Sequence, residues 1–326
     1  MEAIDIALAA DGGYFCGLFV TACSIAKYAS KVVTLRFNIL DGGIDERDWK
    51  SLVEKVSALH SAVEFKRLSV NGDMFADYPD WHGNKMAYAR LMLPDALPDA
   101  DWCIYCDVDF LWMRDITELW AERDERYVFI GTMDGAEWTL AREKVWFEKN
   151  GYPFDPKMYF CSGLCFFNLK AFREQGLVRK IERILRRHSD IQYPDQAALN
   201  IATFGQTKIV SQIWQRFPER VTQTDLNEGC VVHHAGELPW KRVRGSVTLL
   251  SDTIMLWHRF NAAMLGITVW QSLRRYNPAT GILYHRALFW VMRCPLVAWP
   301  LKFACNLLRH AGVYGFLECR AKCLRV

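Results

Sequence analysis

The sequence lacks several features that would assign it to a large class of proteins. No stretch reaches the roughly 18 uninterrupted apolar residues of a membrane-spanning helix. The net charge of +3 is too small to indicate nucleic-acid binding by the whole molecule. No GxGxxG motif follows the first predicted strand, which argues against a dinucleotide-dependent oxidoreductase. The chain has no internal repeat, low-complexity tract or Gly/Ser linker, so a domain boundary is inferred from the change in composition near residues 245–280.

Basic residues are missing from the N-terminal region. The chain opens MEAIDIALAADGG, with acidic residues where a secretory signal has basic ones, so we expect a cytoplasmic protein. In the reducing cytosol its eleven cysteines need not pair, and we interpret them mostly as buried thiols. Cys103 and Cys106 form a CxxC motif, but they lie in an apolar run typical of a strand and face no second such pair. This context argues against a zinc site.

Composition and periodicity together predict an α/β fold. About half of the residues are apolar, and thirteen Trp with nineteen Phe supply large side chains for a packed core. Short β-rich runs alternate with helical patterns, which predicts a mostly parallel central sheet flanked by helices. The predicted strands are 4–9, 33–40, 63–68, 102–105, 128–132 and 163–168, and the predicted helices are 17–28, 45–58, 86–93, 177–187 and 195–204.

An Asp-x-Asp motif follows an almost wholly apolar predicted strand. The sequence YCDVDFLW places Asp107 and Asp109 two residues apart, so an extended segment would point both carboxylates in the same direction. In an open α/β sheet, ligands bind at the carboxyl ends of the strands, where this motif lies. The motif indicates a cation site, although a turn with one capping and one solvated aspartate would also explain it.

A pair of histidines lies far along the chain, in the sequence VVHHAGELPW. A short apolar run there ends in His233 and His234. An imidazole nitrogen completes an oxygen-rich ligand set well for Mn²⁺. A paired histidine can equally be the capped end of a loop. Together with the Asp-x-Asp motif, the histidine pair favours a metal site.

Separated segments of the chain resemble, in order, the motifs of the retaining family 8 glycosyltransferases. This family includes bacterial lipopolysaccharide galactosyl- and glucosyltransferases and the glycogenins. The matching segments are IALAADGGY, MAYARLMLPDAL, YCDVDFLW, YFCSGLCFFNLKAFRE, YPDQAALN and HHAGELPW. The resemblance covers roughly residues 4–245 and implies a nucleotide-binding fold of the GT-A type.

The resemblance also implies a role for individual residues. Asp107, Asp109 and His233 would bind Mn²⁺, or Mg²⁺ in its place, and through it the diphosphate of a UDP-sugar. The catalytic residues would be Asp195 and Gln196, beside the anomeric carbon, and Asp134, in contact with a donor or acceptor sugar. Besides the two aspartates of the motif, the implied donor-binding residues are Ala9, Asp11, Gly13, His82, Arg90, Val108, Gly236 and Lys241.

Three positions depart from the family's pattern. Cys161, a weak hydrogen-bond donor, stands where the family has an asparagine. Ala197 replaces the last carboxylate of an Asp-Gln-Asp motif. The family's HxxGxxKPW motif is one residue short here, so Leu238 precedes Pro239 and no lysine meets the diphosphate. Lys241, Arg242 or Arg244 is predicted to take its place.

The predicted reaction is transfer of galactose or glucose from a UDP-sugar to a saccharide or glycolipid acceptor of a cell-surface glycan such as lipopolysaccharide. Gln196 offers only an amide oxygen as nucleophile, so we favour attack on the face from which the diphosphate leaves. The leaving phosphate oxygen would take the acceptor's proton, Gln196 would support the cation-like carbon, and Asp195 would orient the acceptor. The alternative is a non-catalytic sugar-nucleotide binder or membrane scaffold with the same fold.

The C-terminal residues 286–326 are basic and aromatic. They carry seven Lys or Arg residues against one acid, Glu318, together with Phe289, Trp290, Trp299 and Phe303. This pattern predicts a helical tail that holds the protein on the anionic inner face of the cell membrane, although a helical cap packed on the core is also open. We predict a catalytic domain at 1–250, a connecting helical segment at 251–285 and a membrane-association tail at 286–326.

Overall fold

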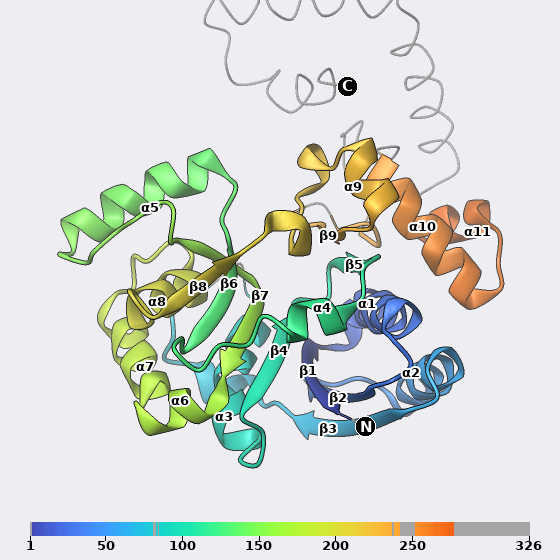
Figure 1. Ribbon diagram of the computed structural model, residues 1–326, viewed down its shortest axis with the longest axis horizontal. Coiled ribbons are helices and arrows are strands. Elements are labelled where there is room, and N and C mark those ends of the chain that lie inside the picture. The colour runs from blue at the N-terminus through green and yellow to red at the C-terminus, as the bar shows by residue number, and fades with distance from the viewer. Residues whose placement is uncertain (1, 81–82, 84, 237, 242–251, 277–326) are drawn as a thin grey trace, which may run out of the picture. The chain divides into compact units, whose positions relative to one another are not determined.

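The computed structural model of the protein describes residues 2–80, 83, 85–236, 238–241 and 252–276 (Figure 1). The chain divides into two compact units, Met1–His233 and His234–Val326. The predicted tail at 286–326 lies outside the described residues, so its association with a membrane stays a prediction.

A seven-stranded sheet with the strand order β3-β2-β1-β4-β7-β6-β8 forms the centre of the first unit (Figure 1). Strand β1 is parallel to β2 and β4, β2 is parallel to β3, and β8 is parallel to β6. Only β7 is antiparallel to its neighbours, β4 and β6. The prediction of a mostly parallel sheet is therefore confirmed. The strands are β1 (Ala3–Ala10), β2 (Thr34–Asp41), β3 (Val63–Ser69), β4 (Trp102–Cys106), β6 (Phe129–Met133), β7 (Phe160–Asn168) and β8 (Thr207–Val210).

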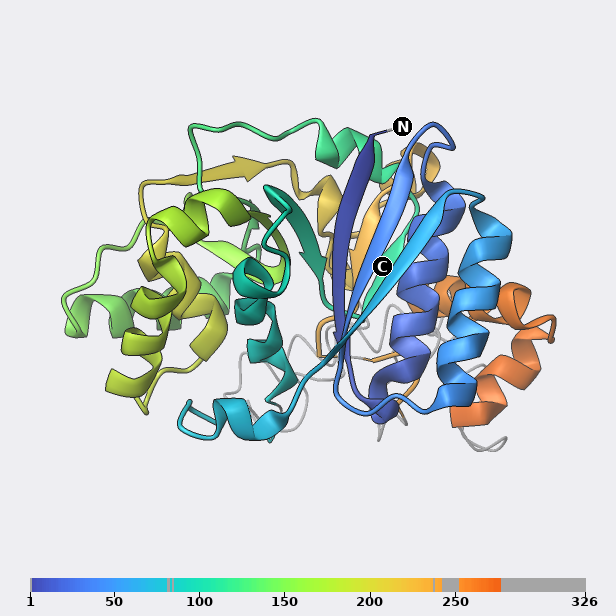
Figure 2. The ribbon, with the colours of Figure 1, turned by 90° about the horizontal axis from the view of Figure 1, so that it is seen from below.

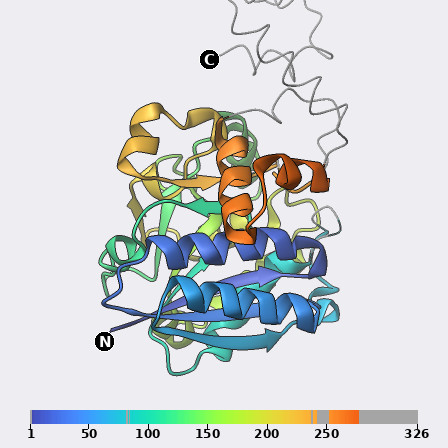
Figure 3. The same ribbon diagram turned by 90° about the vertical axis from the view of Figure 1, so that its right-hand side faces the viewer.

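Helices cover both faces of this sheet, as alternating side chains along its strands require. Helices α1 (Phe15–Tyr28) and α2 (Glu46–Leu59) lie side by side along β1–β3 (Figures 2 and 3). On the other face, Ala7 and Ala9 of β1 share a buried cluster with Ile181 and Leu199. The helices of that face are α3 (Leu93–Ala96), α6 (Leu169–Glu174), α7 (Leu177–Arg187) and α8 (Pro194–Ala202).

A small second sheet was not predicted. Strand β5 (Phe110–Trp112) pairs antiparallel with β9 (Val231–His233), and Phe110 lies opposite His233. Because the chain leaves the large sheet after Cys106 to enter this pairing, Val108 and Asp109 form a turn. The expectation of an extended Asp-x-Asp segment was wrong for this reason. The remaining helices of the unit include α4 (Ile116–Trp120), α5 (Glu137–Lys149) and α9 (Gln223–Glu228), with 3₁₀ turns such as η1 (Gly12–Tyr14), η3 (Met86–Met92) and η4 (Gln212–Trp214).

The described part of the second unit contains two helices, α10 (Asp252–Leu265) and α11 (Val269–Tyr276) (Figure 3). They pack on each other through buried polar groups, because Asn261 donates to the hydroxyl of Ser272 at 3.0 Å and Nδ1 of His258 lies 2.9 Å from the same oxygen. Within the described residues of the whole chain, no helix has the length and apolarity needed to cross a bilayer.

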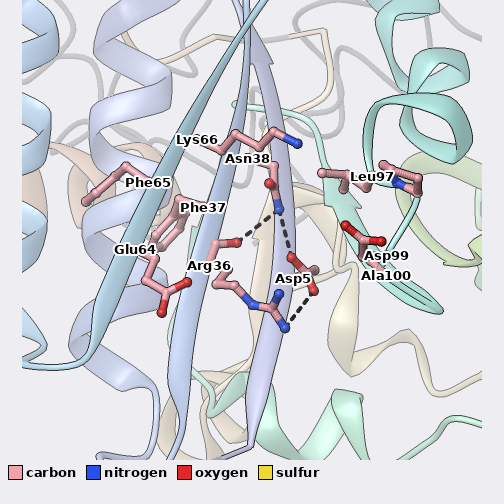
Figure 4. Close-up of a pocket in the computed structure, with 11 residues that line it drawn as sticks. Asp5, Arg36, Phe37, Asn38, Glu64, Phe65, Lys66, Leu97, Asp99 and Ala100 are labelled. Carbon is pink, nitrogen blue, oxygen red and sulfur yellow. Dashed lines mark hydrogen bonds and ion pairs between the residues drawn. The ribbon is translucent and has the colours of Figure 1, made fainter.

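A pocket of about 190 Å³ opens on the face of β1–β3 that is opposite α1 and α2 (Figure 4). Its buried carboxylate is Asp5, which accepts a hydrogen bond from Asn38 at 3.1 Å and lies 3.3 Å from Arg36. Asp5 and Arg36 occupy the N-terminal halves of β1 and β2, whereas ligands of open α/β sheets bind at the carboxyl ends. The pocket is therefore separate from the candidate site described below.

Candidate active site

The three predicted metal ligands lie together at the carboxyl edge of the sheet. Asp107, Asp109 and His233 each offer one ligand atom, and these atoms lie within 4.8 Å of one another. Nε2 of His233 is 3.3 Å from Oδ1 of Asp109. The histidine side chain is 5% exposed, whereas that of Asp107 is 32% exposed, so the cluster opens to solvent on the side of the carboxylates. Two carboxylates and one imidazole form a donor set that suits Mn²⁺ or a similar divalent cation.

Hydrogen bonds from two neighbouring elements fix the turn that carries the aspartates. The hydroxyl of Thr21, in α1, donates to the carbonyl oxygens of Val108 and Phe110, at 2.9 and 2.8 Å. The backbone N–H of Asp107 donates to the carbonyl oxygen of Gly163 in β7 at 2.8 Å. The carboxylates therefore project from a backbone that protein hydrogen bonds hold in place, as a pre-organised cation site requires.

His233 lies in a narrow space between Phe110 and Gly163. Its ring stacks on that of Phe110, with centroids 4.2 Å apart and an interplanar angle of 13°. On the β7 side, a Cβ atom at Gly163 would lie 2.5 Å from Cε1 of the ring, closer than real Cβ atoms approach other atoms. Glycine is thus required at position 163 because the imidazole occupies the space of a side chain.

Burial and the neighbouring charges both shift the pKa values of the cluster. Burial raises the pKa of Asp107 to about 6, although Arg90 acts in the opposite direction. Burial lowers the pKa of His233, but the neighbouring carboxylates, Asp109 first, outweigh it and raise that pKa overall. The neighbouring carboxylates account for the raised pKa of His233, and a divalent cation would neutralise their negative charge.

Arg90 links the metal cluster to the predicted catalytic residues. Its guanidinium is 2% exposed, donates to Asp107 at 2.8 Å and lies 3.2 Å from Oδ2 of Asp195. It also donates to the backbone oxygen of Ser162. The resemblance implies that Arg90 lies in the donor pocket. In the structure its guanidinium contacts the carboxylates of Asp107 and Asp195 and fixes their positions.

The predicted catalytic residues share one buried hydrogen-bond network. Nε2 of Gln196 donates to Oδ2 of Asp134 at 2.9 Å, and Oε1 of Gln196 accepts from the backbone N–H of Ser162 at 2.9 Å. The hydroxyl of Ser162 donates to Asp195 at 2.9 Å. The structure therefore brings Asp134, Asp195 and Gln196 together around Ser162, while their catalytic roles stay predictions.

The other predicted donor-binding residues lie in three places. Ala9 and Asp11 are at the carboxyl end of β1, next to β4 in the sheet, and Asp11 caps η1 by accepting from the N–H of Tyr14 at 3.1 Å. Gly13 follows within η1 and is exposed, and Val108 is buried in the turn described above. Gly236 and Lys241 belong to the second unit, and His82 lies outside the described residues, so their roles stay predictions.

Two groups of side chains that contact these residues were missed in the sequence. Gln215 lies with Nε2 3.0 Å from Nδ1 of His233, and Thr132 donates to Oε1 of Gln215 at 2.7 Å. Tyr159, whose hydroxyl is 3.3 Å from Nε2 of Gln196, donates to Glu143 in α5 at 2.8 Å. No local motif marks these residues, because they come from separate elements that meet only in the fold.

Glu143 is the basis of a prediction on stability. The side chain is fully buried, one of its oxygens has no hydrogen-bond partner among the described residues, and burial raises its pKa to about 7. The folded state thus binds this proton more tightly than the unfolded state, so the stabilising contribution is complete below about pH 4.5 and is lost as the pH rises through about 7. We expect Glu143→Gln to raise the free energy of unfolding by about 1–3 kcal/mol at pH 8 and to change it little at pH 5.

Urea unfolding at the two pH values measures this effect. Glu148→Gln, on the exposed side of the same helix, is the control and should follow the wild type at both values. Equal stabilities of wild type and Glu143→Gln at pH 8 would show that Glu143 is not a buried proton-binding group.

The fold and the site together indicate a class of protein. A mostly parallel sheet with two carboxylates and an imidazole at its carboxyl edge is an α/β architecture with a candidate cation site where such sheets bind ligands. The chain belongs to glycosyl transferase family 8, whose family model matches residues 5–243. It is therefore a glycosyltransferase by family and fold.

The chain is also similar to individual proteins in sequence and in fold. The chain is 25% identical over 263 residues to general stress protein A of Bacillus subtilis (strain 168). The match covers 73% of this chain and 88% of that protein. The galactosyltransferase LgtC was solved in complex with donor and acceptor sugar analogues. Its structure matches this one with a TM-score of 0.65 and 24% identity, and the match covers 80% of this chain and 96% of the LgtC chain. The bifunctional glycosyltransferase WbbM has a TM-score of 0.70 and 16% identity over 84% of this chain, which spans about half (52%) of that protein. These two structures show a shared fold.

Proposed function

We propose that this protein is a retaining hexosyltransferase that moves galactose or glucose from a UDP-sugar to a saccharide or glycolipid acceptor of a cell-surface glycan, with Mn²⁺ as cofactor. One observation carries the proposal: Asp107, Asp109 and His233 place their ligand atoms within 4.8 Å of one another at the carboxyl edge of the sheet. Membership of family 8 supports the transfer of a sugar, and LgtC, which shares the fold, was solved with donor and acceptor sugar analogues.

The proposed cation site lies where the diphosphate of a donor would leave. A divalent cation bound there would stabilise the negative charge of the departing nucleotide diphosphate as a Lewis acid. Asp107, Asp109 and His233 would hold it, and the partly exposed carboxylates leave its other side open to phosphate oxygens. The positive charge of Arg90 offsets the negative charge of Asp107, so the two aspartates of the motif can lie close together before a cation binds.

Gln196 is the proposed group that supports the reacting carbon. Its oxygen accepts one hydrogen bond, from Ser162, and a carbonyl oxygen has a second lone pair to direct at developing positive charge. Its N–H donates to the carboxyl group of Asp134, which polarises the amide and makes that oxygen more negative. In same-face attack the leaving phosphate oxygen takes the acceptor's proton, and Asp195 orients the acceptor.

Replacing Gln196 with alanine is expected to slow sugar transfer roughly 100-fold without abolishing it. The reason is that the variant loses one stabilising dipole but keeps the cation site and the leaving group that accepts the proton. Rates of transfer with saturating donor and Mn²⁺ measure the effect, and Gln223→Ala, an exposed glutamine in α9, is the control. A sugar covalently trapped on any side chain would contradict same-face attack.

A direct experiment separates the proposed enzyme from its alternative, a non-catalytic sugar-nucleotide binder. The shortened histidine motif and Ala197 are the features that favour the alternative. Thermal shifts of the full chain with a panel of nucleotide sugars, with and without Mn²⁺, identify the donor. The matching donor is then incubated with the protein and Mn²⁺, and released sugar is measured. Stabilisation by a UDP-sugar without any release or transfer of sugar would favour the binder over the enzyme.

A further inference from the structure

Arg220 lies at the edge of the candidate site, and no sequence motif marks it. It ends the 3₁₀ turn η5 (Pro218–Arg220), and its backbone N–H donates to the carbonyl oxygen of Phe217 at 2.9 Å. The ring of Phe217 lies 5.5 Å from that of His233, measured between centroids. The turn that carries Arg220 therefore begins beside the metal cluster.

The side chain of Arg220 packs against the backbone that follows β6. A Cβ atom added at Gly135 would lie 2.6 Å from Nη1 and 3.1 Å from Cζ of Arg220. Gly135 is the residue after Asp134, whose carboxyl group accepts a hydrogen bond from Gln196. The guanidinium of Arg220 thus lies next to the predicted catalytic residues.

Glycine at position 135 leaves free the space that the guanidinium occupies. Gly135 is not among the glycines with positive φ, so its backbone conformation is open to any residue. A side chain at this position would push the end of Arg220 away. An arginine whose only role is to be solvated needs no such space, so the two residues together indicate a function for the guanidinium.

The guanidinium of Arg220 is available to a ligand. Arg220 is exposed, and it forms no ion pair with any residue that the structure describes. Arg216, from the same segment, instead pairs with Asp225 at 3.1 Å. The planar set of N–H donors on a guanidinium matches the oxygens of phosphate and carboxylate groups. Arg220 can therefore hold an anionic group that arrives from solution.

The charges of the site indicate which part of a substrate this group belongs to. The metal and catalytic residues include several aspartates, which repel an anion unless a cation holds it: Asp107, Asp109, Asp134 and Asp195. The diphosphate of the donor has the divalent cation as its proposed partner, and galactose and glucose carry no charge. An anionic group that reaches Arg220 therefore belongs to the acceptor.

We propose that Arg220 is a specificity-determining residue that binds a phosphate or carboxylate group of the saccharide acceptor. The inference rests on the proposed sugar transfer and narrows its acceptors to acidic saccharides. The guanidinium donates hydrogen bonds to oxygens of the anionic group and so holds the acceptor next to Asp134. A neutral saccharide lacks this contact and binds more weakly.

Binding of small probes to the full chain tests the proposal. Calorimetric titrations are made with Mn²⁺ and UDP present, so that the proposed donor site is filled, and the probes are glucose 6-phosphate, glucuronate and the neutral methyl glucoside. We expect the wild type to bind the two anionic probes at least about tenfold more tightly than the neutral one, and Arg220→Gln to bind all three alike. Arg183→Gln, at an exposed position in α7, is the control and should match the wild type. Equal affinities of the wild type for charged and neutral probes, or wild-type affinities in Arg220→Gln, would overturn the proposal.

Gly135→Ala gives a second readout, because it moves the guanidinium without removing its charge. The displaced atoms are at the free end of a long side chain, so we expect this variant to fold. It should bind the two anionic probes about tenfold more weakly and methyl glucoside as before. Wild-type affinity of Gly135→Ala for the anionic probes would overturn the proposal, and this variant decides should Arg220→Gln fail to fold.

Titration of UDP with Mn²⁺ and no saccharide separates the two sources of phosphate. Arg220→Gln should bind UDP as tightly as the wild type. A loss for UDP as large as that for glucose 6-phosphate would place Arg220 on the diphosphate of the donor and overturn its assignment to the acceptor. A wild type that binds UDP but does not prefer the anionic probes would remove this inference alone. A wild type that binds no UDP would remove the proposed donor site, and the transferase proposal with it.

Discussion

Asp109→Asn is expected to abolish detectable Mn²⁺ binding and to reduce sugar transfer about 100- to 1,000-fold. The substitution keeps the shape of the side chain but removes one of two negative charges from a cluster whose ligand atoms lie within 4.8 Å of one another. Cation stabilisation of a leaving group contributes several kcal/mol to a reaction barrier, which corresponds to this loss of rate. Titration of Mn²⁺ by calorimetry and the initial rate of transfer measure the two effects.

The prediction is specific to the site and not to the loss of a negative charge in general. Asp95→Asn, at an exposed position in the first turn of α3, is the matched control and should leave both quantities unchanged. The melting temperature of Asp109→Asn without cation should not fall, because the wild-type site carries closely spaced buried charges in that state. Wild-type transfer rates in Asp109→Asn would contradict any role of a cation held by this residue.

Part of this site could be predicted from the sequence because it depends on a strong local pattern. An almost wholly apolar strand of a parallel sheet has to be buried, so the polar residues that end it lie at the carboxyl edge where ligands bind. This argument located Asp107. That His233 lies beside the two aspartates was predicted only from the resemblance to a family. Strands β5 and β9, which bring it there, contain three residues each and are too short to show the alternation of apolar residues that marks a strand.

The surroundings of other residues could not be predicted, because polar side chains are buried there and apolar ones are exposed. Helix α5 was missed since its buried positions include Thr139 and Glu143, whereas Trp138 and Val145 are 56% and 66% exposed. The apolar pattern of that segment therefore does not follow its buried face. Arg90 is buried for a reason that no local pattern contains: its two carboxylate partners, Asp107 and Asp195, come from distant parts of the chain.

Gly163→Ala is expected to weaken Mn²⁺ binding and sugar transfer by at least about tenfold while the protein stays folded. The added Cβ would lie 2.5 Å from Cε1, 3.0 Å from Nε2 and 3.1 Å from Nδ1 of His233, so the imidazole has to move. Phe110 on the other face of the ring limits that movement, and a ligand displaced by a fraction of an ångström loses much of its bond to a cation. Mn²⁺ titration and transfer rates measure the loss.

The effect of Gly163→Ala is steric, because nothing in the backbone at this position demands glycine. Gly163 lies in strand β7 and is not among the glycines with positive φ, so alanine adopts its conformation without strain. Gly72→Ala is the control, since a Cβ there meets no atom within 4 Å, and it should match the wild type in both measurements. Full Mn²⁺ affinity in Gly163→Ala would mean that the ring can shift without losing the cation, and His233 would then not be a required ligand. Loss of affinity in Gly163→Ala, with Gly72→Ala unaffected, would instead show that β7 has no side chain at position 163 because the metal-binding histidine needs that space.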